Sequence, residues 1–125
     1  MEFSLTDREA SLMEVLWERG PSTVAEVRAE LSDELAYTTV LTILRNLEGK
    51  GYVTHEEEGR AHRYAALVAR DAAQRSALKA LKQKLFQGST ELLLTRLVAE
   101  KDLSKAQIER IQRLLDQQPK RGAKK

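Results

Sequence analysis

The segment that indicates the fold most directly is YTTVLTILRNLEGKGYVTHEEEGRAHRYAAL, residues 37–67. Its first part carries apolar residues at helical spacing and predicts a helix over about residues 37–48, closed by Gly49-Lys50-Gly51. Its second part changes period, because residues 52–55 and 62–67 have the composition of strands and are separated by a polar stretch with a glycine. The segment therefore predicts a helix followed directly by a β-hairpin.

A first helix is predicted near the N-terminus, over about residues 7–19. Thr6 and Glu9 have the spacing of a capping box, in which each side chain accepts a hydrogen bond from the backbone N–H of the other residue. Gly20-Pro21 ends the helix, because glycine favours the C-terminal cap and proline cannot continue helical hydrogen bonding. Apolar residues at helical spacing form the expected core face: Ala10, Met13, Leu16 and Trp17.

A short second helix is predicted after this break. Thr23 and Glu26 form another capping signature, and the apolar Val24 and Val27 follow at helical spacing. Three helices within fifty residues, joined by brief turns, are typical of a helix-turn-helix domain. Because a hairpin follows the third helix, the sequence predicts a winged helix-turn-helix DNA-binding domain over residues 1–68.

Residues 69–118 return to helical patterns and predict three further helices, the second capped by Ser89 and the third by Ser104. Their apolar residues could form an intramolecular core or a dimer interface in which the same helices of two chains interlock. The dimer is favoured, because three helices after a compact domain form only a thin layer. The residues expected at the dimer interface are Leu78, Leu81, Leu85, Leu93, Leu97, Ile108, Ile111 and Leu115.

The predicted fold is therefore mainly α with a small β-hairpin wing: a winged helix-turn-helix, a C-terminal helical dimerisation domain and a basic flexible tail over residues 119–125. The chain has 125 residues and a net charge of +2, but the tail contributes four positive charges, so the remainder carries −2. Net charge is thus weak evidence for a nucleic-acid partner, and the argument rests on where the charges lie.

Composition also limits the classes of function. The chain has no cysteine and two histidines, which excludes disulfides and thiolate metal sites and leaves little for catalysis. No apolar run approaches the roughly 20 residues of a transmembrane helix, and the N-terminus lacks the basic and apolar regions of a secretion signal. We expect a cytoplasmic protein with no membrane partner, no cofactor and no catalytic residues.

The helix over residues 37–48 has two different faces. Its apolar residues cluster on one side, while small polar residues and one arginine cluster opposite. Small side chains let a helix approach the major groove, threonine can touch a thymine methyl or a base edge, and arginine can pair with guanine or phosphate. A solvated helix face would show the same pattern, but the position before a hairpin favours a recognition helix. Its expected DNA-binding residues are Thr38, Thr42 and Arg45, with Thr39 and Asn46 at the margin.

The hairpin adds Arg60 and Arg63, which are available for phosphate or minor-groove contacts. Three glutamates, residues 56–58, precede them and would repel phosphates unless they point away. Alternation along a strand can separate neighbouring residues onto opposite faces, and a solvated hairpin explains the same residues. Arg60 and Arg63 are the wing residues that we predict to bind DNA.

His55 and His62 flank the turn of the hairpin and could suggest a metal pair with Glu57 as a third ligand. Two imidazoles without a nearby cysteine make an incomplete site, and surface or packing roles explain both histidines. The sequence signals no Ser-His-Asp or paired-carboxylate arrangement. We therefore predict no metal site and no enzyme.

Five stretches are informative as an ordered set: LTDRE at residues 5–9, TVAEV at 23–27, YTTVLTILRNL at 37–47, GRAHRY at 59–64 and KDLS at 101–104. In this order the chain resembles the BlaI/MecI penicillinase-repressor family over nearly its whole length. The resemblance implies a dimeric repressor of palindromic operators, with the third helix in the major groove and the C-terminal helices intertwined.

In the antibiotic-responsive members of that family, a membrane-bound sensor protease leads to cleavage of the repressor. Alignment on Asp102-Leu103-Ser104 places the family's scissile Asn-Phe pair on Arg96-Leu97, so the pair is not retained. The resemblance thus names a sensor protease as a partner, but the residues at this position do not support cleavage there. The copper-responsive branch uses cysteines near its C-terminus, which this chain lacks.

The sequence predicts a dimeric transcriptional repressor that binds double-stranded operator DNA and blocks a promoter sterically. The alternative is a winged-helix interaction module that docks proteins without sequence-specific DNA binding, and it predicts no salt-dependent retention of any duplex. The operator, the regulated genes and the inducing signal do not follow from the residues.

Overall fold

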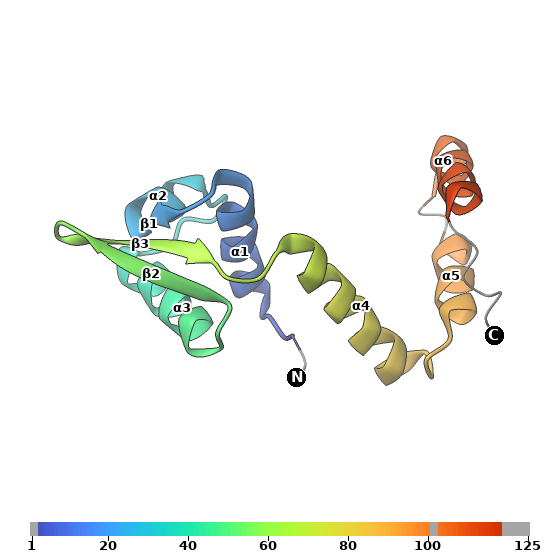
Figure 1. Cartoon of the computed structure of the whole chain (residues 1–125), viewed down its shortest axis with the longest axis horizontal. Helices are drawn as coiled ribbons and strands as arrows, with labels where there is room; N and C mark the ends of the chain where they lie inside the picture. The colour runs from blue at the N-terminus through green and yellow to red at the C-terminus, as the bar shows by residue number, and fades with distance from the viewer. Residues whose placement is uncertain (1–2, 101–102, 119–125) are drawn as a thin grey trace. The chain divides into compact units, whose positions relative to one another are not determined.

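The computed structural model describes residues 3–100 and 103–118 and divides the chain into two compact units, Met1–Ala80 and Leu81–Lys125. It confirms the mainly helical fold with a small antiparallel sheet (Figure 1). The predicted tail, residues 119–125, lies outside the described residues. No helix within the described ranges has the length and apolar character to cross a membrane. A separate dimerisation domain over residues 69–118 stays a prediction.

The first unit begins with three helices that start where their caps predict. The Thr6 hydroxyl accepts a hydrogen bond from the Glu9 amide at 3.1 Å, and the Thr23 hydroxyl accepts one from the Glu26 amide at 3.2 Å. Both glutamates return the bond to the capping threonine, which completes the two capping boxes. The helices are α1 (Asp7–Arg19), α2 (Val24–Glu30) and α3 (Tyr37–Gly49).

The wing is part of a three-stranded antiparallel sheet of order β1-β3-β2 (Figure 1). Strands β2 (Val53–Glu58) and β3 (Ala61–Ala66) confirm the predicted hairpin and are joined by the two-residue turn Gly59-Arg60. Gly59 has a φ of 62°, which glycine adopts without steric cost. The third strand, β1 (Ser22–Thr23), was not predicted, because its sequence has the pattern of a helix cap.

The core of the first unit is built from α1, α2, α3 and the sheet. The prediction for α1 was wrong at Ala10, which is exposed, whereas Leu12 is fully buried. Since Ala10 lies about 200° around the helix from Leu12, the two cannot share one buried face. The buried residues of this core are Leu12, Met13, Leu16, Val24, Val27, Val40, Ile43, Leu44, Leu47, Val53 and Tyr64.

Contacts from Trp17 fix the start of α4 (Arg70–Leu85) against α1. The Trp17 indole N–H donates a hydrogen bond to the Val68 carbonyl at 2.9 Å. The Arg70 guanidinium lies 5.8 Å from the centre of the Trp17 ring and forms an ion pair with Glu14. Cation–π attraction and the ion pair therefore hold the first turn of α4 on α1.

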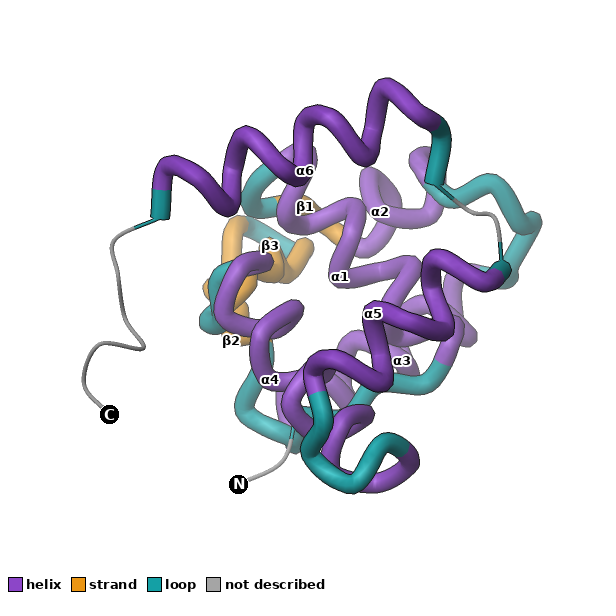
Figure 2. The backbone as a smooth tube through the Cα atoms, turned by 90° about the vertical axis from the view of Figure 1, so that its right-hand side faces the viewer, coloured by secondary structure: helices purple, strands orange, loops and turns teal. Residues whose placement is uncertain are grey.

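The second unit contains α5 (Thr90–Ala99) and α6 (Lys105–Gln117), drawn as purple helices in Figure 2. The Ser89 hydroxyl accepts a hydrogen bond from the Leu92 amide at 3.0 Å, and the Ser104 hydroxyl accepts one from the Gln107 amide at 3.1 Å. These bonds confirm the two predicted caps.

Candidate DNA-binding surface

Helix α3 has one buried face and one exposed face. Val40, Leu44 and Leu47 are completely buried. Thr39 is half-buried and lies between the two faces. The remaining predicted residues of this helix are all exposed: Thr38, Thr42, Arg45 and Asn46. The fold thus leaves a polar surface of α3 open to a partner.

The hydroxyl of Thr42 is already engaged within this surface. Its oxygen donates a hydrogen bond to the Thr38 carbonyl at 2.9 Å. This bond to the preceding turn is a local alternative to contact with a ligand. Because the hydroxyl proton is used, Thr42 offers a partner its methyl group and the acceptor capacity of its oxygen.

The C-terminal end of α3 is held by a buried carboxylate on α1. Lys50 Nζ lies 2.7 Å from Glu9 Oε1, and Glu9 is 5% exposed. Burial raises the pKa of the Glu9 carboxyl, but hydrogen bonds from Lys50 and Thr6, together with the charge on Lys50, outweigh burial and hold that pKa below 4.5. The ionised pair therefore fastens the end of α3 to the start of α1.

The two histidines connect the wing to α3. His55 Nδ1 donates to the carboxylate of Glu48 at 2.8 Å, and the ring of His62 stacks on that of His55 with centroids 4.5 Å apart. His62 Nε2 lies 3.9 Å from a Glu57 oxygen. Across residues 3–100 and 103–118, no three or more His, Asp or Glu side chains are grouped so that they could hold a metal ion. The geometry is that of a packed polar cluster.

Tyr64 of β3 lies under this cluster and is 1% exposed. Burial raises the pKa of its phenol, the negative charge of Glu48 raises it further, and the positive charge of Arg45 partly opposes both. These effects place two α3 side chains within electrostatic range of β3. Arg45, a predicted DNA-binding residue, therefore lies beside the wing.

The two wing arginines have different surroundings. Arg60 is exposed at the hairpin turn, and in the described part of the chain it has no acidic partner. Arg63 is half-buried and forms ion pairs with Glu58 at 2.8 Å and Glu26 at 3.1 Å. The hydrogen bond with Glu58 is the largest effect that raises the pKa of Arg63, and the charge of Glu26 adds to it. Arg60 is open to a partner, whereas the protein itself occupies Arg63.

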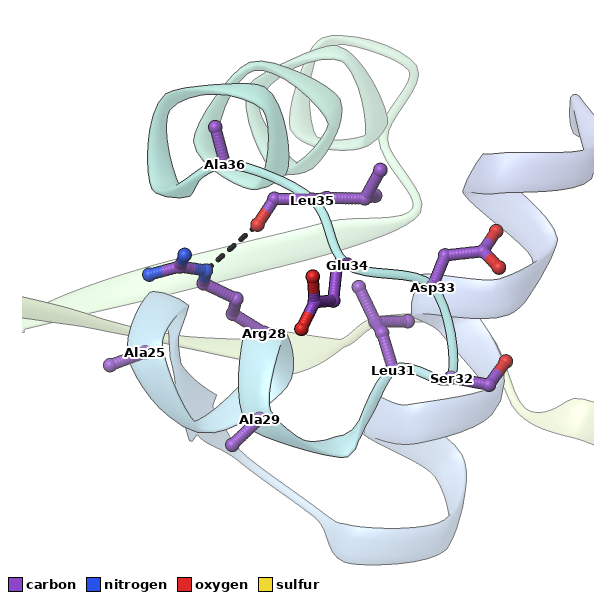
Figure 3. Close-up of a pocket in the computed structure, with 9 residues that line it drawn as sticks. All are labelled: Ala25, Arg28, Ala29, Leu31, Ser32, Asp33, Glu34, Leu35 and Ala36. Atoms are coloured by element: carbon purple, nitrogen blue, oxygen red, sulfur yellow. Dashed lines mark hydrogen bonds between the residues drawn. The ribbon is translucent and has the colours of Figure 1, made fainter.

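Sequence reasoning did not single out Arg28, which lies on the exposed side of α2. Its Nε donates a hydrogen bond to the Leu35 carbonyl at 2.8 Å, in the turn between α2 and α3 (Figure 3). No sequence signal could have shown this contact, because its acceptor is a backbone carbonyl, which every residue type carries.

The predicted dimer residues lie on α4, α5 and α6. Leu93 is buried at 9% exposure. Arg96 and Leu97, on which the family's scissile pair aligns, lie inside α5. The other dimer candidates are large apolar side chains exposed in the single chain: Leu78, Leu81, Leu85, Leu97, Ile108, Ile111 and Leu115. Their role in dimerisation stays a prediction.

Three helices closed by a small antiparallel sheet define the winged-helix class. Solved structures agree: the DNA-binding domain of the repressor BlaI has 30% identity, a TM-score of 0.50, and covers 56% of this chain and 90% of that chain. A MarR family protein from Bacillus stearothermophilus, at 21% identity and a TM-score of 0.51, covers 92% of this chain and 75% of that one and shows the fold alone. The family model of the penicillinase repressor matches residues 5–117. The chain belongs to the penicillinase repressor family.

Curated relatives are transcriptional regulators. The transcriptional regulator BlaI of Mycobacterium tuberculosis (strain CDC 1551 / Oshkosh) is 46% identical over 70 residues, which cover 54% of this chain and 51% of the relative. The chain therefore spans about half the length of that relative. The methicillin resistance regulatory protein MecI of Staphylococcus aureus (strain N315) is 20% identical over 116 residues, covering 91% of this chain and 94% of that protein. Members of the family are regulators and not enzymes.

Proposed function

We propose that the protein is a dimeric transcriptional repressor that binds palindromic operator DNA through α3 and the wing. It acts by steric occlusion of a promoter and catalyses no reaction. Because its target is chromosomal DNA, its place of action is the cytoplasm. Family membership and the winged-helix fold support this proposal.

The exposed polar face of α3 is the observation that carries the proposal. Thr38, Thr42 and Arg45 lie open on the helix that winged-helix proteins place in the major groove. The buried opposite face and the Glu9–Lys50 pair hold this helix rigidly. A rigid helix loses little conformational entropy on binding, which favours affinity.

Dimerisation is supported by the apolar side chains of the second unit. Ile108 and Ile111, three residues apart on α6, are each 37% exposed in the single chain. A two-fold dimer would cover such faces and present two recognition helices to a palindrome. Cleavage by a sensor protease at Arg96-Leu97 is not part of the proposal, because the residues differ from the Asn-Phe pair that the resemblance implies.

The test is to pass fragments of the host genome over the purified protein at near-physiological salt and to sequence what is retained. A shared palindrome, lost with Thr42→Ala and Arg45→Ala proteins, is the expected result. Retention of fragments in proportion to their abundance would contradict the proposal and favour a protein-docking module.

A further inference from the structure

The arginines of the first unit fall into two groups. Arg19 pairs with Glu26, Arg63 with Glu26 and Glu58, and Arg70 with Glu14. These ion pairs fasten elements of the fold to one another. Within the described residues, the arginines of this unit that have no acidic partner are Arg8, Arg28, Arg45 and Arg60. The second group holds the cations that remain available to an anionic partner.

Arg28 differs from the other members of that group because its side chain is anchored. Its Nε donates to the Leu35 carbonyl, which leaves the N–H groups of both Nη atoms for an anion. The carbonyl acceptor lies two residues before the start of α3, so the guanidinium is held beside the first turn of the recognition helix. Anchoring reduces the rotamer entropy that a contact with a partner would cost.

The surroundings of Arg28 favour the approach of a large partner. Two small exposed residues of the same helix, Ala25 and Ala29, line the open hollow beside it. Asp33 and Glu34 line the same hollow without forming an ion pair with Arg28. In Figure 3 the Arg28 guanidinium and the Asp33 carboxylate lie at opposite ends of the hollow. An anion can therefore reach the guanidinium from the end away from Asp33.

We propose that Arg28 is a further DNA-binding residue, whose guanidinium contacts a backbone phosphate beside the groove that α3 enters. In helix-turn-helix proteins the helix before the recognition helix crosses the DNA backbone, where phosphates are within its reach. A phosphate contact positions the protein on the duplex and carries no sequence information. This inference rests on the proposed function and adds α2 to the DNA-binding surface.

The test compares the full chain with Arg28→Gln, Arg28→Lys and the matched control Arg8→Gln. Arg8 lies on α1 and lines a different hollow with Ser11 and Asp33, and its substitution removes the same charge. Fluorescence anisotropy gives the affinity for the enriched operator and for an unrelated duplex over a series of salt concentrations. Thermal unfolding by circular dichroism shows that each variant is folded.

Arg28→Gln is expected to weaken binding to both duplexes by the same factor. Its plot of log affinity against log salt should be shallower by about 0.9 per protomer, the slope of one phosphate contact. Arg28→Lys should keep the slope, because it keeps the charge. Arg8→Gln should change neither quantity beyond the general loss of one distant charge.

Two results would overturn the inference, and they can be told apart. If Arg28→Gln or Arg28→Lys has the affinity and slope of Arg8→Gln relative to the full chain while the full chain binds its operator, Arg28 contacts no phosphate and the proposed function stands. If the full chain retains no duplex in a salt-dependent manner, the proposed function fails and this inference with it.

Discussion

The hydroxyl of Thr42 donates a hydrogen bond to the carbonyl oxygen of Thr38, 2.9 Å away on the same face of α3. The proton that could read a base acceptor is thus satisfied inside the helix. What Thr42 brings to a groove is chiefly its methyl group, which can contact the methyl of thymine.

We therefore predict that Thr42→Val keeps operator affinity within about twofold, whereas Thr42→Ser weakens it by about 0.8 kcal/mol, the value of one buried methyl-sized group. Fluorescence anisotropy with the enriched operator measures both variants. Equal losses for valine and serine would show that the hydroxyl, and not the methyl group, makes the contact.

The two wing arginines should separate into different roles. Arg60→Gln is expected to weaken DNA binding and flatten its salt dependence without changing the thermal midpoint, because Arg60 is exposed and unpaired within the described residues. Arg63→Gln is expected to lower the thermal midpoint, because it breaks the ion pairs with Glu26 and Glu58. Thermal melts and salt titrations of the two variants test this. A lowered midpoint for Arg60→Gln alone would reverse the assignment.

The Glu9–Lys50 pair should make stability depend on pH. Because the pKa of Glu9 in the folded chain lies below 4.5, its ordinary value, the unfolded chain binds more protons at acidic pH. The stabilisation is complete above about pH 4.5 and is lost as the pH falls through the folded pKa. Urea unfolding at neutral and acidic pH should show a shallower pH dependence for Glu9→Gln than for the unsubstituted chain.

Removing the other partner should also be costly. Lys50→Met leaves a nearly buried carboxylate without its cation, and a loss of about 1–3 kcal/mol at neutral pH is expected. Lys79→Met, at an exposed position of α4, is the matched control and should cost little. Equal unfolding free energies for the two variants would show that the Glu9–Lys50 contact adds no stability.

The apolar face of α6 should decide the oligomeric state. Light scattering is expected to give twice the 14.2 kDa chain mass for the unsubstituted protein and the single mass for Ile111→Asp. A charge placed in an apolar interface opposes association, whereas Gln112→Asp, on the neighbouring exposed position, should leave the dimer intact. A monomeric unsubstituted chain would contradict the proposed dimer.

Local signals predicted the helices well because their starts depend on neighbours in sequence. Thr6 with Glu9 and Ser104 with Gln107 place two helix starts correctly, since each cap is closed within three residues. The exposed face of α3 was equally predictable from helical spacing. The core face of α1 was predicted less well, because Ala10 is apolar enough to suit either a buried or an exposed position.

Contacts between distant residues could not be predicted in this way. Glu26 lies 37 residues from Arg63, and nothing in the spacing of either residue indicates that they pair. The strand β1 forms because β3 offers it partners across the fold, through Tyr64 and Arg63. These long-range contacts separate the arginines that hold the fold from those that remain open to DNA.

The most direct test of the central claim is a base-by-base substitution scan of the enriched operator, measured with the unsubstituted chain and with Arg45→Ala. If the exposed face of α3 reads bases, Arg45→Ala weakens operator binding by about 1–3 kcal/mol and loses discrimination at one base pair of each half-site while the other positions keep theirs. An unchanged profile and affinity for Arg45→Ala would contradict the claim that this face of α3 determines which DNA the protein binds.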